Sequence, residues 1–191
     1  MDLLTIGKPM ALEKAEFEMN EVESGELGDL AQKGQSRWLH VILFEPEIAA
    51  NTGAIGRTCL ALGARLWLVR PLGFRLDEKN LRRAGLDYWR DVDVHVVEDY
   101  QTALDLCQPK NIWLMTTKAT KEHWDATFSV GDALVFGPES RGLPSWILES
   151  KESEQRLRIP MRAETRSLNL ANAATVAMYE AARQLRPPLC D

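Results

Sequence analysis

The fold class is decided by residues 39–62, which read LHVILF EPEIAANT GAIGRTCLAL. The first six, Leu39–Phe44, form an apolar run of strand length, and Gly53–Leu62 has a composition compatible with a helix. A strand that is apolar on both faces is typical of a sheet with helices packed on each side. The stretch therefore predicts one strand–loop–helix unit of an α/β protein.

The same alternation continues along the chain. Apolar runs predict further strands at Leu66–Val69, Val92–Val97, Ile112–Met115, Ala133–Phe136 and Leu157–Ile159. Helix-compatible segments lie at Asp77–Ala84, Asp99–Cys107, Pro144–Ser150 and about Asn169–Leu185. This order predicts an α/β fold with a mainly parallel sheet covered by helices on both faces.

The last predicted helix is rich in alanine. Leu170, Ala174 and Met178 recur at helical spacing, and the other faces also carry small residues such as Ala171 and Ala182. Small side chains allow close backbone approach. Two readings remain open: the helix packs only on its own sheet, or it also packs against a second subunit.

Composition and charge divide the chain into two parts. The 191 residues are 45% hydrophobic and 27% charged, which is typical of a globular protein and excludes collagen-like, wholly disordered and disulfide-scaffold classes. Residues 1–36 hold eight acidic and three basic residues, so they carry the whole net charge of −5. We expect residues 1–36 to be a mobile extension, with a possible short helix at Ala11–Glu23, and residues 37–191 to form the domain. The neutral remainder permits a local basic face for nucleic acid but does not demonstrate one.

Cysteine spacing and apolar segments bear on location. Cys59, Cys107 and Cys190 are far apart and lack C-x-x-C spacing, which argues against a disulfide framework and a zinc site. No apolar run approaches the roughly 20 residues that span a bilayer, and the first residues lack the pattern of a secretory signal. We expect a cytoplasmic protein without a membrane segment or a metal.

Ligands of open α/β sheets bind at the carboxyl ends of the strands, so the loops after the strands are the candidate sites. After the first strand, Asn51 or Thr52 is positioned to cap the helix that presents Arg57. An ordinary cap and a surface salt bridge are the simpler explanations. Neither G-x-G-x-x-G nor G-K-[ST] is present, which disfavours a dinucleotide site and a P-loop.

A basic and aromatic segment, LRRAGLDYWR, occupies residues 81–90. Its arginines suit phosphate contacts, and Tyr88 and Trp89 suit stacking on bases. A solvated helix end with a core tryptophan is an equally good explanation.

Two later loops combine glycine with polar side chains. FGPESRGLP, residues 136–144, leaves a strand through Gly137, where glycine allows either close approach of a ligand or a tight turn, and Glu139 and Arg141 flank the same bend. In IPMRAETRSLNLAN, residues 159–172, the polar groups of Ser167 and Asn169 either cap the last helix or meet a ligand.

Taken together, three of these segments resemble the motifs of the SPOUT RNA methyltransferases: NTGxxxR at 51–57, FGPESRGLP at 136–144, and RIPM at 158–161 with RSLNLANA at 166–173. Within that superfamily, EPEIAANTG, LRRAGLDYW and the TTK of residues 116–118 are similar to the TrmL (YibK-like) tRNA 2′-O-methyltransferases, which modify the wobble nucleotide. The resemblance covers about Trp38 to Arg186. Residues 1–36 lie outside it, and Ala49-Ala50 replaces a frequent Pro-Pro.

The resemblance implies an α/β fold with a carboxyl-terminal trefoil knot, a homodimer, and S-adenosyl-L-methionine as methyl donor without a metal. It implies a cofactor pocket formed by Met115, Thr116, Gly137, Ile159, Pro160, Ser167 and Leu168, and catalytic roles for Arg57, Asn51 and Glu139. It also implies contacts with the anticodon stem-loop of tRNA, or with the dimer interface, from Arg82, Arg83, Tyr88, Lys118, Arg141, Asn169, Asn172 and Tyr179.

The reaction implied is transfer of a methyl group to the ribose 2′-hydroxyl of a wobble cytidine or modified uridine. Arginine is an awkward general base because its side chain stays protonated in proteins. Arg57 is therefore expected to orient the hydroxyl, stabilise its developing charge or pass its proton onward. A SPOUT enzyme acting on another RNA position and a noncatalytic RNA-binding module are the alternatives.

Overall fold

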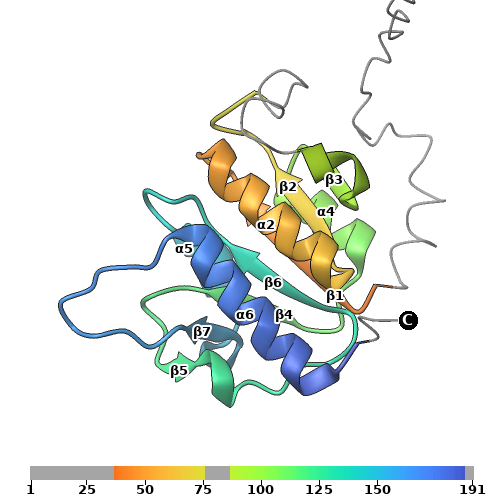
Figure 1. The fold of residues 1–191 in the computed structure, drawn as a ribbon. Coiled ribbons are helices and arrows are strands. Elements are labelled where there is room, and N and C mark those ends of the chain that lie inside the picture. Colours follow the sequence, from red (N-terminus) through yellow and green to blue (C-terminus); the bar gives the residue numbers. More distant parts are fainter. Residues whose placement is uncertain (1–36, 76–86, 188–191) are drawn as a thin grey trace, which may run out of the picture.

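The computed structural model describes residues 37–75 and 87–187 (Figure 1). The strands in these ranges are β1 Leu39–Phe44, β2 Arg65–Val69, β3 Val94–Val97, β4 Ile112–Met115, β5 Lys121–Glu122, β6 Asp132–Phe136 and β7 Arg156–Arg158. The α-helices are α2 Ala49–Leu62, α4 Tyr100–Cys107, α5 Ser145–Glu149 and α6 Leu170–Leu185. Short 3₁₀ helices lie at η1 Asp87–Asp91, η2 His123–Asp125 and η3 Ser153–Gln155.

The strands form one sheet in the order β3-β2-β1-β6-β4-β7-β5, and every neighbouring pair is parallel. All residues of β1, β2 and β6 are buried, which explains why their sequences are mostly apolar and do not alternate; one polar residue lies in each, His40, Arg65 and Asp132. Because the strands run in one direction, their carboxyl ends form a single edge of the sheet. The predicted α/β fold with a mainly parallel sheet is confirmed.

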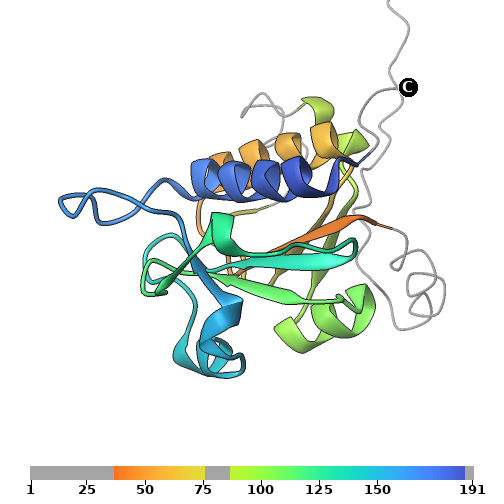
Figure 2. The ribbon, with the colours of Figure 1, turned by 90° about the horizontal axis from the view of Figure 1, so that it is seen from below.

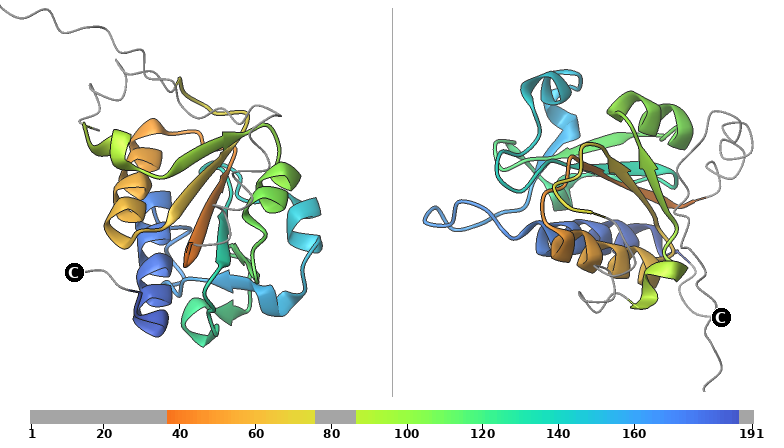
Figure 3. Two further views of the ribbon diagram at one scale, coloured as in Figure 1. Left: turned by 90° about the vertical axis from the view of Figure 1, so that its right-hand side faces the viewer. Right: turned by 90° about the horizontal axis from the view of Figure 1, so that it is seen from above.

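Helices cover both faces of this sheet. α2 and α6 lie side by side on one face, and α4 and α5 cover the other (Figures 2 and 3). The hydroxyl groups of Thr58 and Thr175 meet across the α2–α6 contact at 3.1 Å. The buried alanines of α6, including Ala174 and Ala177, allow this close approach, so the helix does pack on its own chain.

Strand ends differ from the predictions where polar residues are buried. β1 and β4 have the predicted bounds, but β6 begins one residue early, at Asp132. Its buried carboxylate accepts hydrogen bonds from Asn111, Trp113 and Ser129 at 2.7–3.1 Å, so a charged residue is tolerated inside the sheet. Polar partners from distant segments are not visible in a hydrophobic pattern.

At the amino-terminal edge of the sheet, Asp93 ties several segments together. Its carboxylate lies 2.7 Å from Nε of Arg37, 3.0 Å from Nε of Arg65 and 3.1 Å from Nε2 of His95. Burial and the nearby Arg65 charge lower the pKa of the adjacent His40 to about 4. β3 therefore begins at Val94, after this ion-pair cluster, and not at the predicted Val92.

One predicted cap is wrong. α2 begins four residues before the predicted Gly53, and its N-cap residue is Ile48, whose side chain makes no capping bond. Asn51 and Thr52 lie inside the first turn and cap nothing. The short strand β5 was not predicted, because two residues carry no periodic signal. The predicted helix at Asp77–Ala84 and the possible helix at Ala11–Glu23 fall outside the described residues.

Candidate functional site

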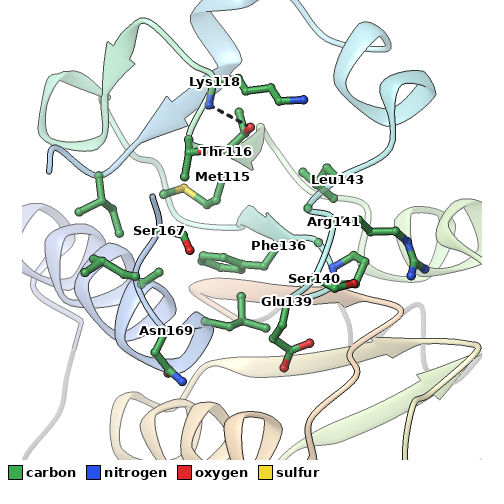
Figure 4. A pocket seen from close by; sticks show the side chains of 18 of the residues that line it. Met115, Thr116, Lys118, Phe136, Glu139, Ser140, Arg141, Leu143, Ser167 and Asn169 are labelled. Carbon is green, nitrogen blue, oxygen red and sulfur yellow. Dashed lines mark hydrogen bonds between the residues drawn. The ribbon is translucent and has the colours of Figure 1, made fainter. Parts of the chain in front are cut away.

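A cavity of about 490 Å³ opens at the carboxyl ends of β4, β6 and β7. This volume lies in the range of about 300–1,000 Å³ that is usual for small-molecule sites. Three separate segments build most of its wall: residues 115–118, 136–143 and 167–170. In Figure 4, Met115, Phe136 and Ser167 converge at its centre, each from a different segment.

The predicted cofactor pocket coincides with this cavity in all but one residue. The lining includes Met115, Thr116, Gly137, Ile159, Ser167 and Leu168. Pro160 follows Ile159 in the chain but is not part of the lining. Six of the seven residues predicted for the pocket are therefore brought together by the fold.

Gly137 has a structural reason of its own. A Cβ atom there would lie 2.3 Å from the carbonyl carbon of Gly142 and 2.3 Å from the nitrogen of Leu143. The loop folds back on itself, and the amide of Gly142 donates to the carbonyl of Pro138 at 2.9 Å. The structure supports the tight turn, because the chain itself approaches Gly137, and Gly137 also lines the cavity.

Glu139 supplies the cap that α2 lacks. Its carboxylate accepts hydrogen bonds from the amides of Glu47 at 2.8 Å and Ile48 at 3.3 Å. It also accepts one from the side-chain amide of Asn51 at 2.9 Å. A carboxylate at a helix N-terminus satisfies free N–H groups and interacts favourably with the helix dipole. The 136–144 loop therefore holds the start of α2 in place.

Asn51 extends this connection to the third motif. Its side-chain oxygen accepts a hydrogen bond from the Asn169 side chain at 2.9 Å. The Asn169 oxygen in turn accepts from the amides of Ala171 at 2.9 Å and Asn172 at 3.3 Å, which makes it the N-cap of α6. One chain of hydrogen bonds thus joins the three motif segments, and the predicted capping role of Asn169 is confirmed.

A second set of hydrogen bonds joins the 136–144 loop to the start of α2, and here the accepting carboxylate is on the α2 side. Glu47 accepts hydrogen bonds from the amide of Ser140 at 2.9 Å and from its hydroxyl at 2.7 Å. These bonds hold the pKa of Glu47 below its usual value. Arg141 donates to Glu47 at 3.1 Å and also pairs with Glu45. In Figure 4 the Arg141 side chain points away from Met115, and Arg141 is nevertheless one of the residues that line the cavity.

Arg57 lies outside the cavity of its own chain. Its guanidinium carbon sits 4.1 Å from the centre of the Tyr88 ring, and the Tyr88 hydroxyl donates to the carbonyl of Gly53 at 2.9 Å. The Arg57 side chain is exposed on α2, about 9 Å along the helix axis from Asn51. The expected catalytic arginine is therefore well held, but it is not turned toward the residues that line the cavity.

Trp89 belongs to the core. It is 2% exposed, and a Cβ atom at Gly56 would lie 2.5 Å from its ring. Of the two explanations for Trp89, core packing is confirmed and stacking on RNA bases is wrong. Gly56 in α2 makes room for the indole of Trp89. Because the two residues lie in different segments, the sequence pattern of neither segment indicates this contact.

The remaining predicted RNA contacts are scattered. Lys118 is exposed at the cavity wall, and its amide donates to the Thr116 hydroxyl at 3.3 Å. Asn172 and Tyr179 are exposed on α6 and do not line the cavity. Arg82 and Arg83 fall outside the described residues.

Several lining residues were not singled out from the sequence. They include Ile48, Thr117, Leu148, Leu157 and Met161. Leu157 lies in a predicted strand, and Ile48, Thr117 and Met161 lie inside quoted motifs; Leu148 had no signal beyond its place in a predicted helix.

Among residues 37–75 and 87–187, no cluster of histidine, cysteine, aspartate and glutamate has metal-site geometry. No helix in the same ranges is long and apolar enough to cross a bilayer.

Comparison with known proteins gives this site a family. A tRNA (cytidine(34)-2′-O)-methyltransferase of Yersinia pestis is 48% identical over 155 residues, covering 78% of this chain and 96% of that protein. A solved structure described as giving insights into 2-OH methylation of C/U34 on tRNA is 43% identical, covers 78% of this chain and 97% of its own, and has a TM-score of 0.71.

A more distant structure shows the same fold with a bound ligand. The SpoU methyltransferase AviRb from Streptomyces viridochromogenes, in complex with the cofactor AdoMet, is 26% identical with a TM-score of 0.68. The match covers 78% of this chain and 58% of that one. These similarities confirm the resemblance seen in the motifs. With a family model that matches residues 38–179, the chain belongs to the SpoU rRNA Methylase family.

Proposed function

We propose that this protein transfers a methyl group from S-adenosyl-L-methionine to the ribose 2′-hydroxyl of the wobble nucleotide of tRNA, a cytidine or a modified uridine. The observation that carries the proposal is the relative named for cytidine-34 methylation, which is 48% identical over 96% of its own length. The cavity supports it, because the three motif segments shared with RNA methyltransferases meet there.

The cavity suits S-adenosyl-L-methionine in size and chemistry. Apolar side chains such as Phe136, Leu143 and Ile159 line it together with the polar groups of Thr116 and Ser167. An apolar pocket with a few polar groups is the usual arrangement for a cofactor with an aromatic base. The bound cofactor would supply a methyl group activated by its positive sulfur, and no residue of the chain needs to form a covalent bond.

The protein's own contribution is alignment. Methyl transfer requires the attacking oxygen, the carbon and the sulfur in line, and fixed geometry of this kind lowers a barrier substantially. The hydrogen bonds that join Glu139, Asn51 and Asn169 hold the loops that would carry both reactants. Arginine side chains are poor general bases in proteins, so the proposed role of Arg57 is to orient the hydroxyl and to stabilise its developing negative charge.

A homodimer would bring Arg57 to a cavity. Leu60, three residues after Arg57 on α2, is 37% exposed, and the neighbouring helix α6 exposes Val176 and Tyr179. Exposed apolar side chains on adjacent helices are typical of a subunit interface. We propose that this α2–α6 face pairs with its copy, so that Arg57 of one subunit serves the cavity of the other.

Subunit mixing tests this arrangement. Arg57→Ala leaves the cavity intact, and Ser167→Trp fills the cavity while leaving Arg57. Each variant alone should be inactive, and a refolded mixture should regain activity in mixed dimers. A mixture as inactive as its components, or an active monomer by light scattering, contradicts a shared site.

The RNA would be held by cationic side chains. We propose that Lys118, Arg82 and Arg83 contact phosphates of the anticodon stem-loop. Replacing each by alanine should weaken tRNA binding and lower the slope of its salt dependence by about one unit for each phosphate that is no longer neutralised. Affinity for the methyl donor should not change. A variant with an unaltered salt slope does not touch phosphate.

The chain path and the surroundings complete the proposal. By resemblance to the SPOUT enzymes, the carboxyl-terminal segment that contains the three cavity loops is threaded as a trefoil knot. Pulling the chain by its two ends would detect the knot, because the unfolded chain would extend less far than an unknotted chain with the same number of residues. Residues 1–36 are an extension to a domain of residues 37–191. A cytoplasmic location suits a tRNA substrate and the buried free thiols of Cys59 and Cys107.

Methylation of total tRNA by the purified protein, followed by mapping of the modified nucleoside, tests the function directly. The expected product is a 2′-O-methyl group at the wobble position. Methylation at another RNA position would identify a different member of the superfamily. A protein that binds RNA but neither binds nor consumes S-adenosyl-L-methionine would be a noncatalytic module.

A further inference from the structure

Helix α5 carries an exposed tryptophan, Trp146, that the site described above does not use. Its side chain is 58% exposed. The ring nevertheless has two firm contacts, with Phe44 at 5.9 Å and 78° and with Tyr100 at 5.9 Å and 71°. Phe44 and Tyr100 also meet edge to face, at 6.3 Å and 87°.

These contacts hold the indole in one orientation. Phe44 and Tyr100 are almost fully buried and belong to different elements, β1 and α4, so both rings are fixed by the core. Edge-to-face contacts of this kind favour one arrangement over others. The exposed indole surface is therefore pre-organised, and binding of a partner would cost little side-chain entropy of Trp146.

Trp146 lies at the same edge of the sheet as the cavity. Phe44 is the last residue of β1, and the preceding Leu43 pairs in register with Phe136, which lines the cavity. α5 follows the 136–144 loop directly, and Leu143 and Leu148 on either side of Trp146 both line the cavity. α5 therefore adjoins the cavity that the reacting nucleotide would enter.

The charged residues closest to Trp146 along its own helix and beside Tyr100 are acidic, namely Glu149 and Asp99, which favours a base over a phosphate as its partner. Glu45, after Phe44, pairs with Arg141. Glu98, before Tyr100, lies 3.1 Å from Arg70. Single-stranded RNA is commonly recognised by stacking of unpaired bases on aromatic side chains, which needs no local charge.

We propose that Trp146 is a stacking surface for an unpaired base of the substrate RNA that flanks the methylated nucleotide. This inference rests on the proposed function, because it takes RNA as the substrate of the neighbouring cavity. Trp146 positions the substrate and takes no part in the chemistry.

The test compares Trp146→Ala, Trp146→Phe and a control, Trp124→Ala. Trp124 is similarly exposed but lies in η2, which packs on α6 at the opposite face of the sheet. Loss of one stacked base should raise the Kd for unmodified tRNA about tenfold, equivalent to ~1.4 kcal/mol. Trp146→Phe should recover most of the affinity, and the control should bind as the wild type does.

Further measurements separate the possible failures. Affinity for S-adenosyl-L-methionine and oligomeric state should be the same in Trp146→Ala as in the wild type. Loss of the ring contacts with Phe44 and Tyr100 should lower the melting temperature, so tRNA affinity is compared for the folded protein at a temperature where every variant is fully folded. Three results would overturn the inference: equal losses of tRNA affinity in the Trp146 and Trp124 variants, an unchanged tRNA affinity in Trp146→Ala, or a changed oligomeric state. If the wild type still methylates tRNA, the proposed function stands in each of these cases. A wild type that transfers no methyl group to tRNA would instead reject the proposed function and, with it, this inference.

Discussion

Replacing Glu139 by alanine should loosen the whole site, because this carboxylate caps a helix from a distant loop. Glu139 accepts hydrogen bonds from the amides of Glu47 and Ile48 and from the side chain of Asn51. α2 has no capping side chain at its own N-cap residue, Ile48. Removal of the carboxylate therefore leaves the helix start and the Asn51 amide without their acceptor.

The size of the effect follows from these hydrogen bonds. Loss of a side-chain cap costs about 1 kcal/mol, and loss of a negative charge at a helix N-terminus costs about 0.3–1 kcal/mol. The Asn51 amide, left without its acceptor in a partly buried position, adds about 1 kcal/mol. The sum is about 2–3 kcal/mol. For a domain of this size the melting temperature should fall by roughly 5–10 °C.

Calorimetry on Glu139→Ala, Glu139→Gln and a control measures this directly. The glutamine variant keeps one acceptor and should lose about half as much stability. Glu149→Ala, at an exposed position on α5, should stay within about 0.5 kcal/mol of the wild type. Wild-type stability in Glu139→Ala would refute the capping role. Lost methyl transfer at full stability would instead assign Glu139 to the reaction.

Three other outcomes are expected. Trp89→Ala should lose about 3–5 kcal/mol of stability in chemical denaturation, with normal tRNA affinity for each folded molecule; a stable variant contradicts core packing. Folding lowers the pKa of His40 to about 4, so the free energy of unfolding should fall as the pH drops from 6.5 toward 4. In a His40→Gln variant, compared with the wild type by denaturation across that pH range, the free energy of unfolding should fall less. Parallel profiles for the two proteins would show that His40 is not responsible. Deletion of residues 1–36 should leave a cooperative thermal transition and cofactor binding by calorimetry; loss of either would show that the extension belongs to the fold.

Local patterns were sufficient for elements whose burial is continuous. Leu39–Phe44 and Ile112–Met115 were predicted with their observed bounds, because a strand buried on both faces has a mostly apolar sequence, interrupted here only by His40. Asn169 is the N-cap of α6 and was one of the capping candidates, because a cap acts within three residues of itself. Two of the loops that line the cavity, 136–144 and 159–172, were also predicted, because parallel strands place their exits at one edge. The lining residues 115–118 were identified only through the family resemblance.

Elements that depend on distant partners were not predictable in this way. β6 starts at Asp132 because Asn111, Trp113 and Ser129 satisfy its carboxylate. Asn51 was taken for a cap, yet it bonds Glu139 and Asn169 across the site. The two hydrogen bonds of Asn51 join segments 88 and 118 residues apart and leave no periodic trace in either one.

The sequence by itself determined the α/β class and the parallel sheet, since burial and helical or strand periodicity are properties of neighbouring residues. It determined the three motif segments through their resemblance to a known family. Only the tertiary structure decided that Glu139 caps α2, that Trp89 fills the space above Gly56, and that Arg57 lies outside its own cavity. These facts depend on side chains that meet across the fold. Packing geometry, which is set by all elements together, determines which of them come within hydrogen-bond or van der Waals distance.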